Sequence, residues 1–227
     1  MDITTGFGPV VGGSNPSGGI VNILITLLMP EELEESQETE IVVAGSMRKY
    51  KEQLDKAIDG FRNSGVKVLA PERSEAINPG EEFILLATND PKEPWHKIEE
   101  EFLKQIRHAD FLYVANINGY VGQSAATEMA YARLEEAPII TAEPIQEFGK
   151  EVPVDLRELL KSLVVGQLPI DSITKKSVNE LNESLKTHKF PELANEQRRA
   201  LARMIRPLLR DLKTNYEEYV KNQGTQK

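Results

Sequence analysis

The chain of 227 residues is 40% hydrophobic and 28% charged, a composition typical of one soluble globular domain with an appendage. It has no cysteine, which excludes disulfides and thiolate catalysis, and its three histidines, at 96, 108 and 188, lack the spacing of a metal site. A net charge of −9 disfavours binding of duplex nucleic acid. We therefore expect no metal ion, no cofactor and no duplex nucleic acid as a partner.

The first 40 residues have the composition of a peripheral arm. Residues 6–19 are rich in glycine, proline and serine, and residues 31–40 contain six glutamates. The apolar run between them, Ile20–Met29, is interrupted by Asn22 and is shorter than the roughly 20 residues of a membrane helix. We expect a mobile arm and a cytoplasmic protein that does not bind membranes. An added edge strand, or a cover for a partner subunit, is the alternative role for the apolar run.

From Ile41 the chain alternates between short apolar runs, the first of them β-branched, and amphipathic helical patterns. The runs are typical of strands buried on both faces of a parallel sheet. Predicted strands cover residues 41–45, 66–71, 83–87, 111–115 and 138–142, and predicted helices fill most of the intervals, the third covering 124–136. This order predicts an α/β domain over residues 41–150, a doubly wound five-stranded parallel sheet of the flavodoxin or Rossmann-like kind.

Residues 151–227 show only helical periodicity and are predicted to form a helical extension. The last predicted helix has an apolar seam on one side and a basic face on the other. The seam consists of Leu201, Ile205, Leu208, Leu212, Tyr216 and Tyr219, and the basic face of Arg199, Arg203, Arg206, Arg210 and Lys213. We interpret the basic face as solvated, with contact to an acidic partner or to the acidic arm as the alternative. The length of the seam favours a homo-oligomer, at least a dimer.

Three polar loops follow predicted strands and converge on the edge of the sheet where small molecules bind in such folds. They are Gly45-Ser46-Met47-Arg48, Thr88-Asn89-Asp90 and Asn116 to Ser124. The first loop offers backbone N–H groups at a helix start together with Arg48 and Lys49, a combination that suits phosphate. An ordinary turn before a helix is the alternative interpretation of this loop.

Glu128 is the most informative candidate for chemistry. If Ser124 is the N-cap of the predicted helix, Glu128 lies one residue past the position of a capping-box glutamate. On a helical wheel it falls beside Ala125, Met129 and Ala132, on the small and apolar face. A partly desolvated carboxylate near a helix N-terminus can serve as a nucleophile. A surface glutamate that merely favours the helix dipole is the alternative.

Other acids near the predicted edge differ in position. Asp110 begins its strand, far from the carboxyl-end loops, so we interpret it as structural. Asp90 follows the third predicted strand and is the candidate acid or base that would assist Glu128. Asn116 and Asn118 can form hydrogen bonds with a sugar but cannot exchange protons near neutral pH.

The run GYVGQSAATEMAYA, preceded by ADFLYVANIN and followed by PII, resembles the nucleotide-binding signature of the nucleoside 2-deoxyribosyltransferase family. AGSMRKY resembles the first-strand loop of that family, and the resemblance covers about residues 41–145. It implies that Glu128 attacks C1′ of a deoxyribose, expels the base and forms a glycosyl-enzyme. A related group of N-glycosidases hydrolyses deoxynucleoside 5′-monophosphates, and its Gly-Ser-Ile-Arg loop is similar to Gly45–Arg48.

The leading hypothesis is therefore an enzyme that cleaves or exchanges the N-glycosidic bond of (deoxy)nucleosides or their 5′-monophosphates. Glu128 would be the nucleophile and Asp90 the acid or base. The predicted sugar and phosphate contacts are Gly45, Ser46, Met47, Arg48, Asn116, Gly119, Tyr120 and Ser124. The rival hypothesis is a catalytically weak nucleotide sensor or adaptor that acts through its C-terminal helices. A scaffold without a ligand is the third possibility.

Overall fold

The computed structural model describes residues 38–78, 84, 86–88 and 95–187, and eleven positions further on. Those positions are 193, 195, 198, 199, 201–203, 205–207 and 210. The predicted N-terminal arm lies outside the described residues, apart from its last three positions. Within the described part of the chain, no helix combines the length and apolarity that crossing a bilayer requires.

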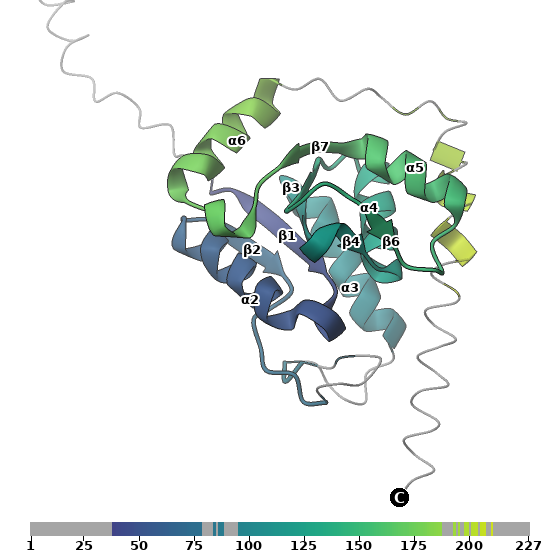
Figure 1. Cartoon of the computed structure of the whole chain (residues 1–227), viewed down its shortest axis with the longest axis horizontal. Coiled ribbons are helices and arrows are strands. Elements are labelled where there is room, and N and C mark those ends of the chain that lie inside the picture. The colour runs from purple at the N-terminus through teal and green to yellow at the C-terminus, as the bar shows by residue number, and fades with distance from the viewer. Residues whose placement is uncertain are drawn as a thin grey trace, which may run out of the picture. The chain divides into compact units, whose positions relative to one another are not determined.

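A five-stranded parallel sheet forms the centre of the molecule (Figure 1). Its strand order is β2-β1-β3-β5-β7, so chain order is reversed once, between β1 and β3. The strands are β1 (Glu40–Gly45), β2 (Lys67–Ala70), β3 (Phe111–Ala115), β5 (Ile139–Thr141) and β7 (Val164–Gln167). This arrangement confirms the predicted doubly wound α/β fold of the flavodoxin kind.

Helices cover both faces of the sheet, as Figure 1 shows. Alternate residues of each strand point to opposite faces, so β1 sends Val42 and Ala44 to one core cluster and Ile41 and Val43 to the other. The first face is covered by α3 (Trp95–His108), α4 (Gln123–Leu134) and α5 (Val154–Leu163). The second is covered by α2 (Met47–Asn63) and α6 (Lys175–Thr187).

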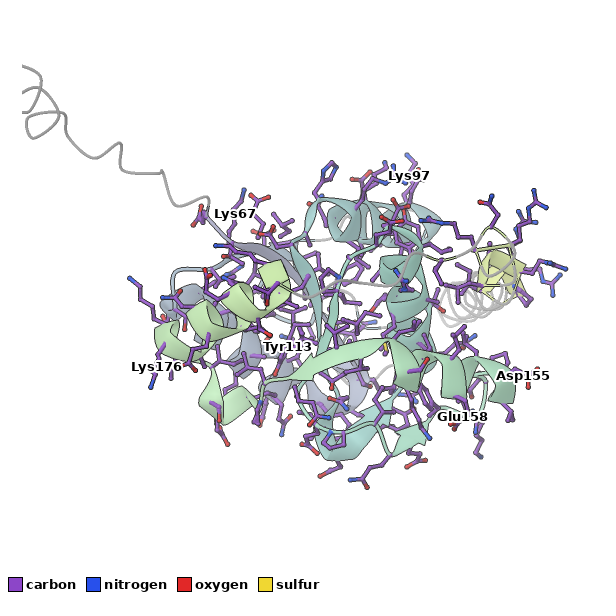
Figure 2. All side chains as sticks on the ribbon, turned by 90° about the horizontal axis from the view of Figure 1, so that it is seen from above. Lys67, Lys97, Tyr113, Asp155, Glu158 and Lys176 are labelled. Carbon is purple, nitrogen blue, oxygen red and sulfur yellow. The ribbon has the colours of Figure 1, made fainter. Side chains whose placement is uncertain are left out.

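Tyr113 of β3 anchors the second face (Figure 2). It has no exposed surface, its ring centroid lies 4.8 Å from that of Phe61, and its hydroxyl donates to the carbonyl oxygen of Leu168 at 2.8 Å. Aromatic pairs of this kind add to the stabilisation from area burial. The chain after β7 is thus fixed to the centre of the sheet, where η2 (Ile170–Ser172) leads into α6.

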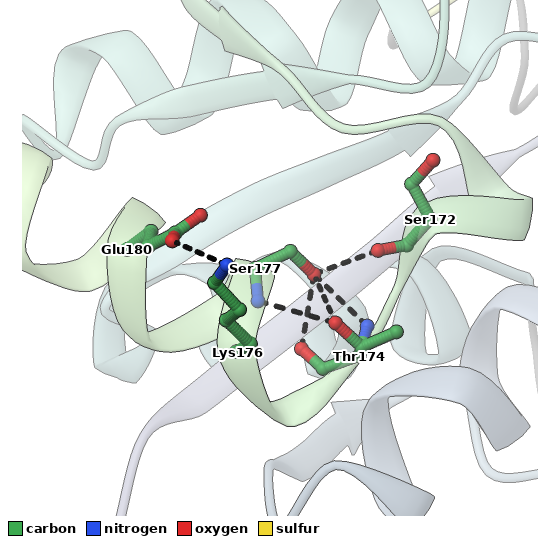
Figure 3. A network of polar contacts seen from close by, with 5 residues as sticks. All are labelled: Ser172, Thr174, Lys176, Ser177 and Glu180. Atoms are coloured by element: carbon green, nitrogen blue, oxygen red, sulfur yellow. Dashed lines mark hydrogen bonds and ion pairs between the residues drawn. The ribbon is translucent and has the colours of Figure 1, made fainter.

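The start of α6 is held by a local hydrogen-bond network (Figure 3). Thr174 Oγ1 accepts from the backbone N–H of Ser177 at 3.2 Å, and Ser177 Oγ accepts from the N–H of Thr174 at 2.9 Å. These reciprocal bonds satisfy backbone N–H groups that a helix start otherwise leaves without partners. Asp110 acts similarly at the opposite edge of the sheet, where its carboxylate accepts from Glu40 N at 2.8 Å, which confirms its structural role.

Two strand predictions were wrong. Within the predicted strand 83–87, Leu86 forms only an isolated antiparallel bridge with Ala76 and does not join the sheet. The fifth strand is β7, in the region that we predicted to be purely helical. Helix α5 ends at Leu163, and Val164 and Val165 then pack against opposite core clusters. A short apolar run fits either a helix or a strand period, and pairing with β5 decides in favour of the strand.

The predicted C-terminal seam is confirmed where the structure describes it. Leu201 and Ile205 are buried and join the core cluster beneath α3, α4 and α5. Arg198 fixes this segment to the end of α4 by donating to Leu134 O at 3.0 Å and pairing with Glu136. Arg199, Arg203, Arg206 and Arg210 are exposed, as expected of a solvated face, whereas the remaining seam positions and Lys213 lie outside the described residues.

The connection from β3 to α4 is compact. It contains the turn η1 (Ile117–Gly119) and the short strand β4 (Tyr120–Val121), which pairs in parallel with β6 (Glu147–Phe148). Gly119 has a φ of 67°, and a Cβ atom there would lie 2.6 Å from the carbonyl oxygen of Pro144. Both the backbone conformation and the close approach of the 144–146 segment therefore require glycine at this position.

Gly119→Ala should destabilise the protein more than Gly65→Ala. Both glycines have positive φ, but a Cβ atom at Gly65 would meet nothing within 4 Å. Gly65→Ala should cost only the backbone strain, roughly 1–2 kcal/mol, and Gly119→Ala a further 1–3 kcal/mol or so from overlap. Urea unfolding of both variants measures the difference, and equal losses would contradict the close packing described for Gly119.

Candidate active site

The candidate site lies where strand order reverses, between β1 and β3. Their last residues, Gly45 and Ala115, are neighbours in register, and the chain leaves β1 toward α2 on one face and β3 toward α4 on the other. Diverging connections leave a crevice at the carboxyl ends of such strands, which is the usual ligand site of open α/β sheets. The predicted residues 45–48 and 116–124 follow these two strands directly.

The first loop is shaped by Gly45 and Ser46. A Cβ atom on Gly45 would lie 2.9 Å from Leu54 Cδ1 and 3.3 Å from Ala115 O, so the strand ends pack closely. Ser46 is the N-cap of α2, and its hydroxyl accepts from Lys49 N at 3.4 Å. Met47 is half-buried and Arg48 is exposed, without an ion-pair partner among the described side chains. The loop therefore presents a helix start beside a cation, which favours anionic ligands.

A cation–π contact joins the two loops. The ammonium group of Lys49 lies 3.6 Å from the centroid of the Tyr120 ring, so the start of α2 contacts β4. Tyr120 is half-buried, and its hydroxyl group lies near Gly122 and Gly149. Tyr120 is thus well placed to hold the first loop against the second.

Asn116 acts as a clamp between neighbouring strand ends. It is 1% exposed, and its side-chain amide donates to Glu143 O at 2.7 Å while its Oδ1 accepts from Glu143 N at 2.9 Å. The loops after β3 and β5 are therefore tied together by one side chain. Because Asn116 uses both its amide nitrogen and its Oδ1 atom to bind Glu143, little of its side chain is left to form the hydrogen bonds with a sugar that we predicted. Asn118 is exposed, with a φ of 55° in the left-handed region.

Helix α4 begins earlier than predicted. Its N-cap is Gly122, and Ser124 is the second residue of the helix, so the prediction of Ser124 as the N-cap was wrong. Glycine has no side chain to cap the helix, so none of the first N–H groups of α4 is satisfied by the N-cap residue's side chain. Glu128 consequently lies in the second turn, not the first. The helix dipole, which weakens beyond the first turn, stabilises its ionised form less than expected.

Glu128 is buried, and the alternative of a surface glutamate is therefore wrong. The residue is only 7% exposed, and its Oε2 atom is buried with no hydrogen-bond partner among the residues that the structure describes. The neighbouring helical positions Ala125, Met129 and Ala132 are likewise buried. Burial raises the pKa of the Glu128 carboxyl well above its ordinary range, and the charge of Glu99 raises it further.

Glu99 is the site residue that sequence reasoning missed. It is the fifth residue of α3, and Glu128 is the sixth residue of α4. Both helices return from the carboxyl-end edge of the sheet, so the two side chains lie at a similar depth. Glu99 is half-buried as a residue, but its Oε1 atom is buried with no hydrogen-bond partner in the described part of the chain, and burial raises its pKa to about 7.

A signal for Glu99 was present in the sequence. Phe102 and Ile106 define the apolar stripe of α3, and Glu99 lies three and seven residues before them on the same helical face. The position of Glu99 on the apolar face was overlooked because it begins a run of three glutamates at 99–101, and such a run is usually solvated. Asp90, predicted as the second acid, lies outside the described residues.

Burial and mutual repulsion both oppose a double negative charge on these two neighbouring carboxyl groups, so the pair favours a shared proton more strongly than exposed glutamates do. Such a pair can supply a proton donor and a carboxylate within one site. This is the combination needed for acid–base chemistry at a glycosidic bond. No group of three metal-binding side chains occurs among the described residues.

The fold is a doubly wound α/β sheet, and a buried carboxyl pair joins α3 to α4, the helix that follows the loop after β3. Comparison with known proteins found no matching family model, no matching curated protein and no matching solved structure.

The Glu128 pair should make stability fall as pH rises. A carboxyl whose pKa is raised by folding contributes stability that is complete below its unfolded pKa and is lost through the folded pKa. In Glu128→Gln, the difference in unfolding free energy between about pH 5 and about pH 8 should shrink by on the order of 1–3 kcal/mol. Urea unfolding at both pH values measures this. Glu100→Gln, an exposed change on α3, is the control, and an unchanged pH dependence in Glu128→Gln would contradict the assignment.

Proposed function

We propose that the protein cleaves or exchanges the N-glycosidic bond of (deoxy)nucleosides or their 5′-monophosphates, as a deoxyribosyltransferase-like enzyme or an N-glycoside hydrolase. The single observation that carries this proposal is the buried Glu128 carboxyl beside Glu99, on the helix that follows the loop after β3. The resemblance of residues 119–132 to the signature of deoxyribosyltransferases supports the same function.

In the first step, the Glu128 carboxylate attacks C1′ of the sugar. A C1′–O bond forms as the C1′–N bond breaks, and the base departs with the bonding electrons. Protonated Glu99 donates its proton to the departing base, so the pair ends the step with Glu128 esterified and Glu99 ionised. Positive charge that develops at C1′ favours the ionised form of Glu128, and the shared proton then resides on Glu99.

In the second step, Glu99 acts as the base. It accepts a proton from water, or from an acceptor base, as that nucleophile attacks C1′ and releases the Glu128 carboxylate. The proton lost in the first step is thereby restored. The raised pKa of Glu99, about 7, suits a group that must donate and accept protons near neutral pH. Asp90, outside the described residues, stays a candidate for the same role.

The predicted substrate residues take different parts in this proposal. Backbone N–H groups at Met47 and the side chain of Arg48 would bind an anionic group on the substrate. Tyr120 would face the sugar or base, whereas Asn116 and Gly119 would act by holding the loop, given their contacts with Glu143 and Pro144. Gly45, Ser46 and Ser124 would complete the lining of the substrate site.

A binding function without turnover is the second candidate. The observation that favours it is the strongly raised pKa of Glu128, since a protonated carboxyl is a poor nucleophile. In that case the protein would sense a nucleotide and signal through its C-terminal helices. The two candidates differ in whether bound nucleotide loses its base.

Glu128→Gln should abolish base release, with a loss of about 10³-fold or more in turnover. Glu99→Gln should lower turnover of natural nucleosides by roughly 10²–10⁴-fold, because the base then leaves without protonation. Activity of Glu99→Gln should recover on a deoxyriboside with a p-nitrophenolate leaving group, which needs no proton. Chromatography of released base from nucleosides and 5′-monophosphates measures the first two effects, and absorbance the third.

Glu100→Gln is the matched control, since it makes the same change one residue along α3 on an exposed side chain. It should retain wild-type turnover. Unchanged base release in Glu128→Gln would refute the nucleophile assignment. Saturable binding of a nucleotide, detected by thermal shift, without any base release by the wild-type protein would favour the sensor function instead.

A further inference from the structure

A separate hollow lies between β6 and the first turns of α5, and none of the residues predicted for the active site lines it. Its volume is about 470 Å³, within the range of small-molecule sites. Its lining includes Lys150, Arg157 and Lys161, with Glu147 and Glu158 among them. Figure 2 shows Glu158 and Asp155 on α5 at the outside of the molecule.

Arg157 is held in place by the turn before its own helix. Its Nε donates to Val152 O at 2.8 Å, and its Nη2 donates to Gly149 O at 3.2 Å and to Lys150 O at 3.3 Å. Three carbonyl oxygens therefore bind the edge of the guanidinium group formed by Nε and Nη2, and so fix the orientation of its plane. No bond from Nη1 to another described residue is formed, so two N–H groups remain available to a ligand.

Arg157 also has no carboxylate partner within ion-pair distance among the described residues. Carbonyl dipoles orient the positive charge but do not neutralise it. Lys161 is paired with Glu158 at 3.0 Å, so these two charges offset each other. Lys150 and Arg157 then face a single remaining acid, Glu147, and the hollow has a net positive charge within a protein of net charge −9.

One exposed apolar side chain adjoins these cations. Val154 lies in the lining and is 70% exposed, more than any other large hydrophobic residue that the structure describes, whereas Phe148, also in the lining, is buried. A bound group that covered Val154 would remove apolar surface from water, worth roughly 25 cal/mol per Å². The hollow thus combines a fixed guanidinium, a second cation and an apolar surface.

We propose that this hollow is a binding site for a small phosphate monoester with an apolar or aromatic part. Lys150 and Arg157 exceed Glu147 by one positive charge, so the lining favours an anion. The three terminal oxygens of a phosphate can accept from Arg157 Nη1 and from Lys150 together, whereas a carboxylate offers only two oxygens. The ring of the ligand would cover Val154. This site is independent of the proposed chemistry at Glu128.

Phenyl phosphate is the probe, with inorganic phosphate and benzoate as the comparison ligands. Titration of the ¹⁵N-labelled full-length protein should give saturable shifts of backbone amides at residues 146–150 and 154–161 and of the Arg157 Nε–H signal. Phenyl phosphate should bind at least several-fold more tightly than either comparison ligand, because only it offers both the phosphate and the ring.

Val154→Asp places a negative charge on an exposed side chain and should weaken binding at least tenfold without unfolding the protein. Lys150→Gln should weaken it several-fold. Ser162→Asp adds the same charge to an exposed position of α5 outside the lining and should leave binding unchanged. Neither Val154 nor Lys150 supports the turn through its side chain in the described structure, so these variants avoid the folding defect expected of Arg157→Ala.

An absence of saturable shifts, or equal weakening by Val154→Asp and Ser162→Asp, would overturn the site. Tighter binding of benzoate than of phenyl phosphate would overturn the choice of phosphate. Shifts confined to residues 45–48 and 120–128 would place the probe in the crevice near Glu128 instead, also against the proposal. Glu128→Gln should bind phenyl phosphate normally in the hollow, so failure of the enzymatic proposal and failure of this one are distinguishable.

Discussion

Burying the Glu128 carboxyl beside that of Glu99 costs free energy that packing elsewhere in the fold must offset. The raised pKa values of both groups express that cost, because each ionisation is harder in the folded chain than in water. A leucine or glutamine at position 128 would fill the same space with a smaller free-energy cost of burial. Natural proteins break local rules of this kind mainly where function requires it, which is why the pair marks the candidate site.

The rest of the fold fixes where that pair lies. Strand order reverses between β1 and β3, and α3 and α4 both return from the same edge of the sheet. Asn116 ties the loop after β3 to Glu143, Gly119 admits the 144–146 segment, and Lys49 lies on the ring of Tyr120. Two carboxyl groups that repel each other when ionised stay close only if the surrounding strands and loops hold them rigidly.

Sequence reasoning succeeded where one physical signal dominated. Short apolar runs between helical patterns predicted β1, β2, β3 and β5, and the wheel position of Glu128 predicted its burial. It failed where two signals overlapped. Val164 and Val165 fit helix and strand periods equally, so β7 was not predicted. Glu99 lies in an acidic run, so its burial was not predicted. Ser124 looked like the better cap than Gly122, because side-chain preference cannot reveal a cap formed by backbone alone. Contacts between distant segments, such as α3 with α4, are set by packing and leave little trace in local sequence.

The most direct test is a pH titration of the two side chains by NMR in the full chain labelled with ¹³C at glutamate carboxyl carbons. Glu128→Gln and Glu99→Gln assign the two signals. A shared, buried pair predicts that both signals titrate above the ordinary glutamate range near 4.3, and that each substitution lowers the apparent pKa of the remaining partner. Titration of both groups near 4.3, unaffected by loss of the partner, would contradict the existence of the pair and of the site built on it.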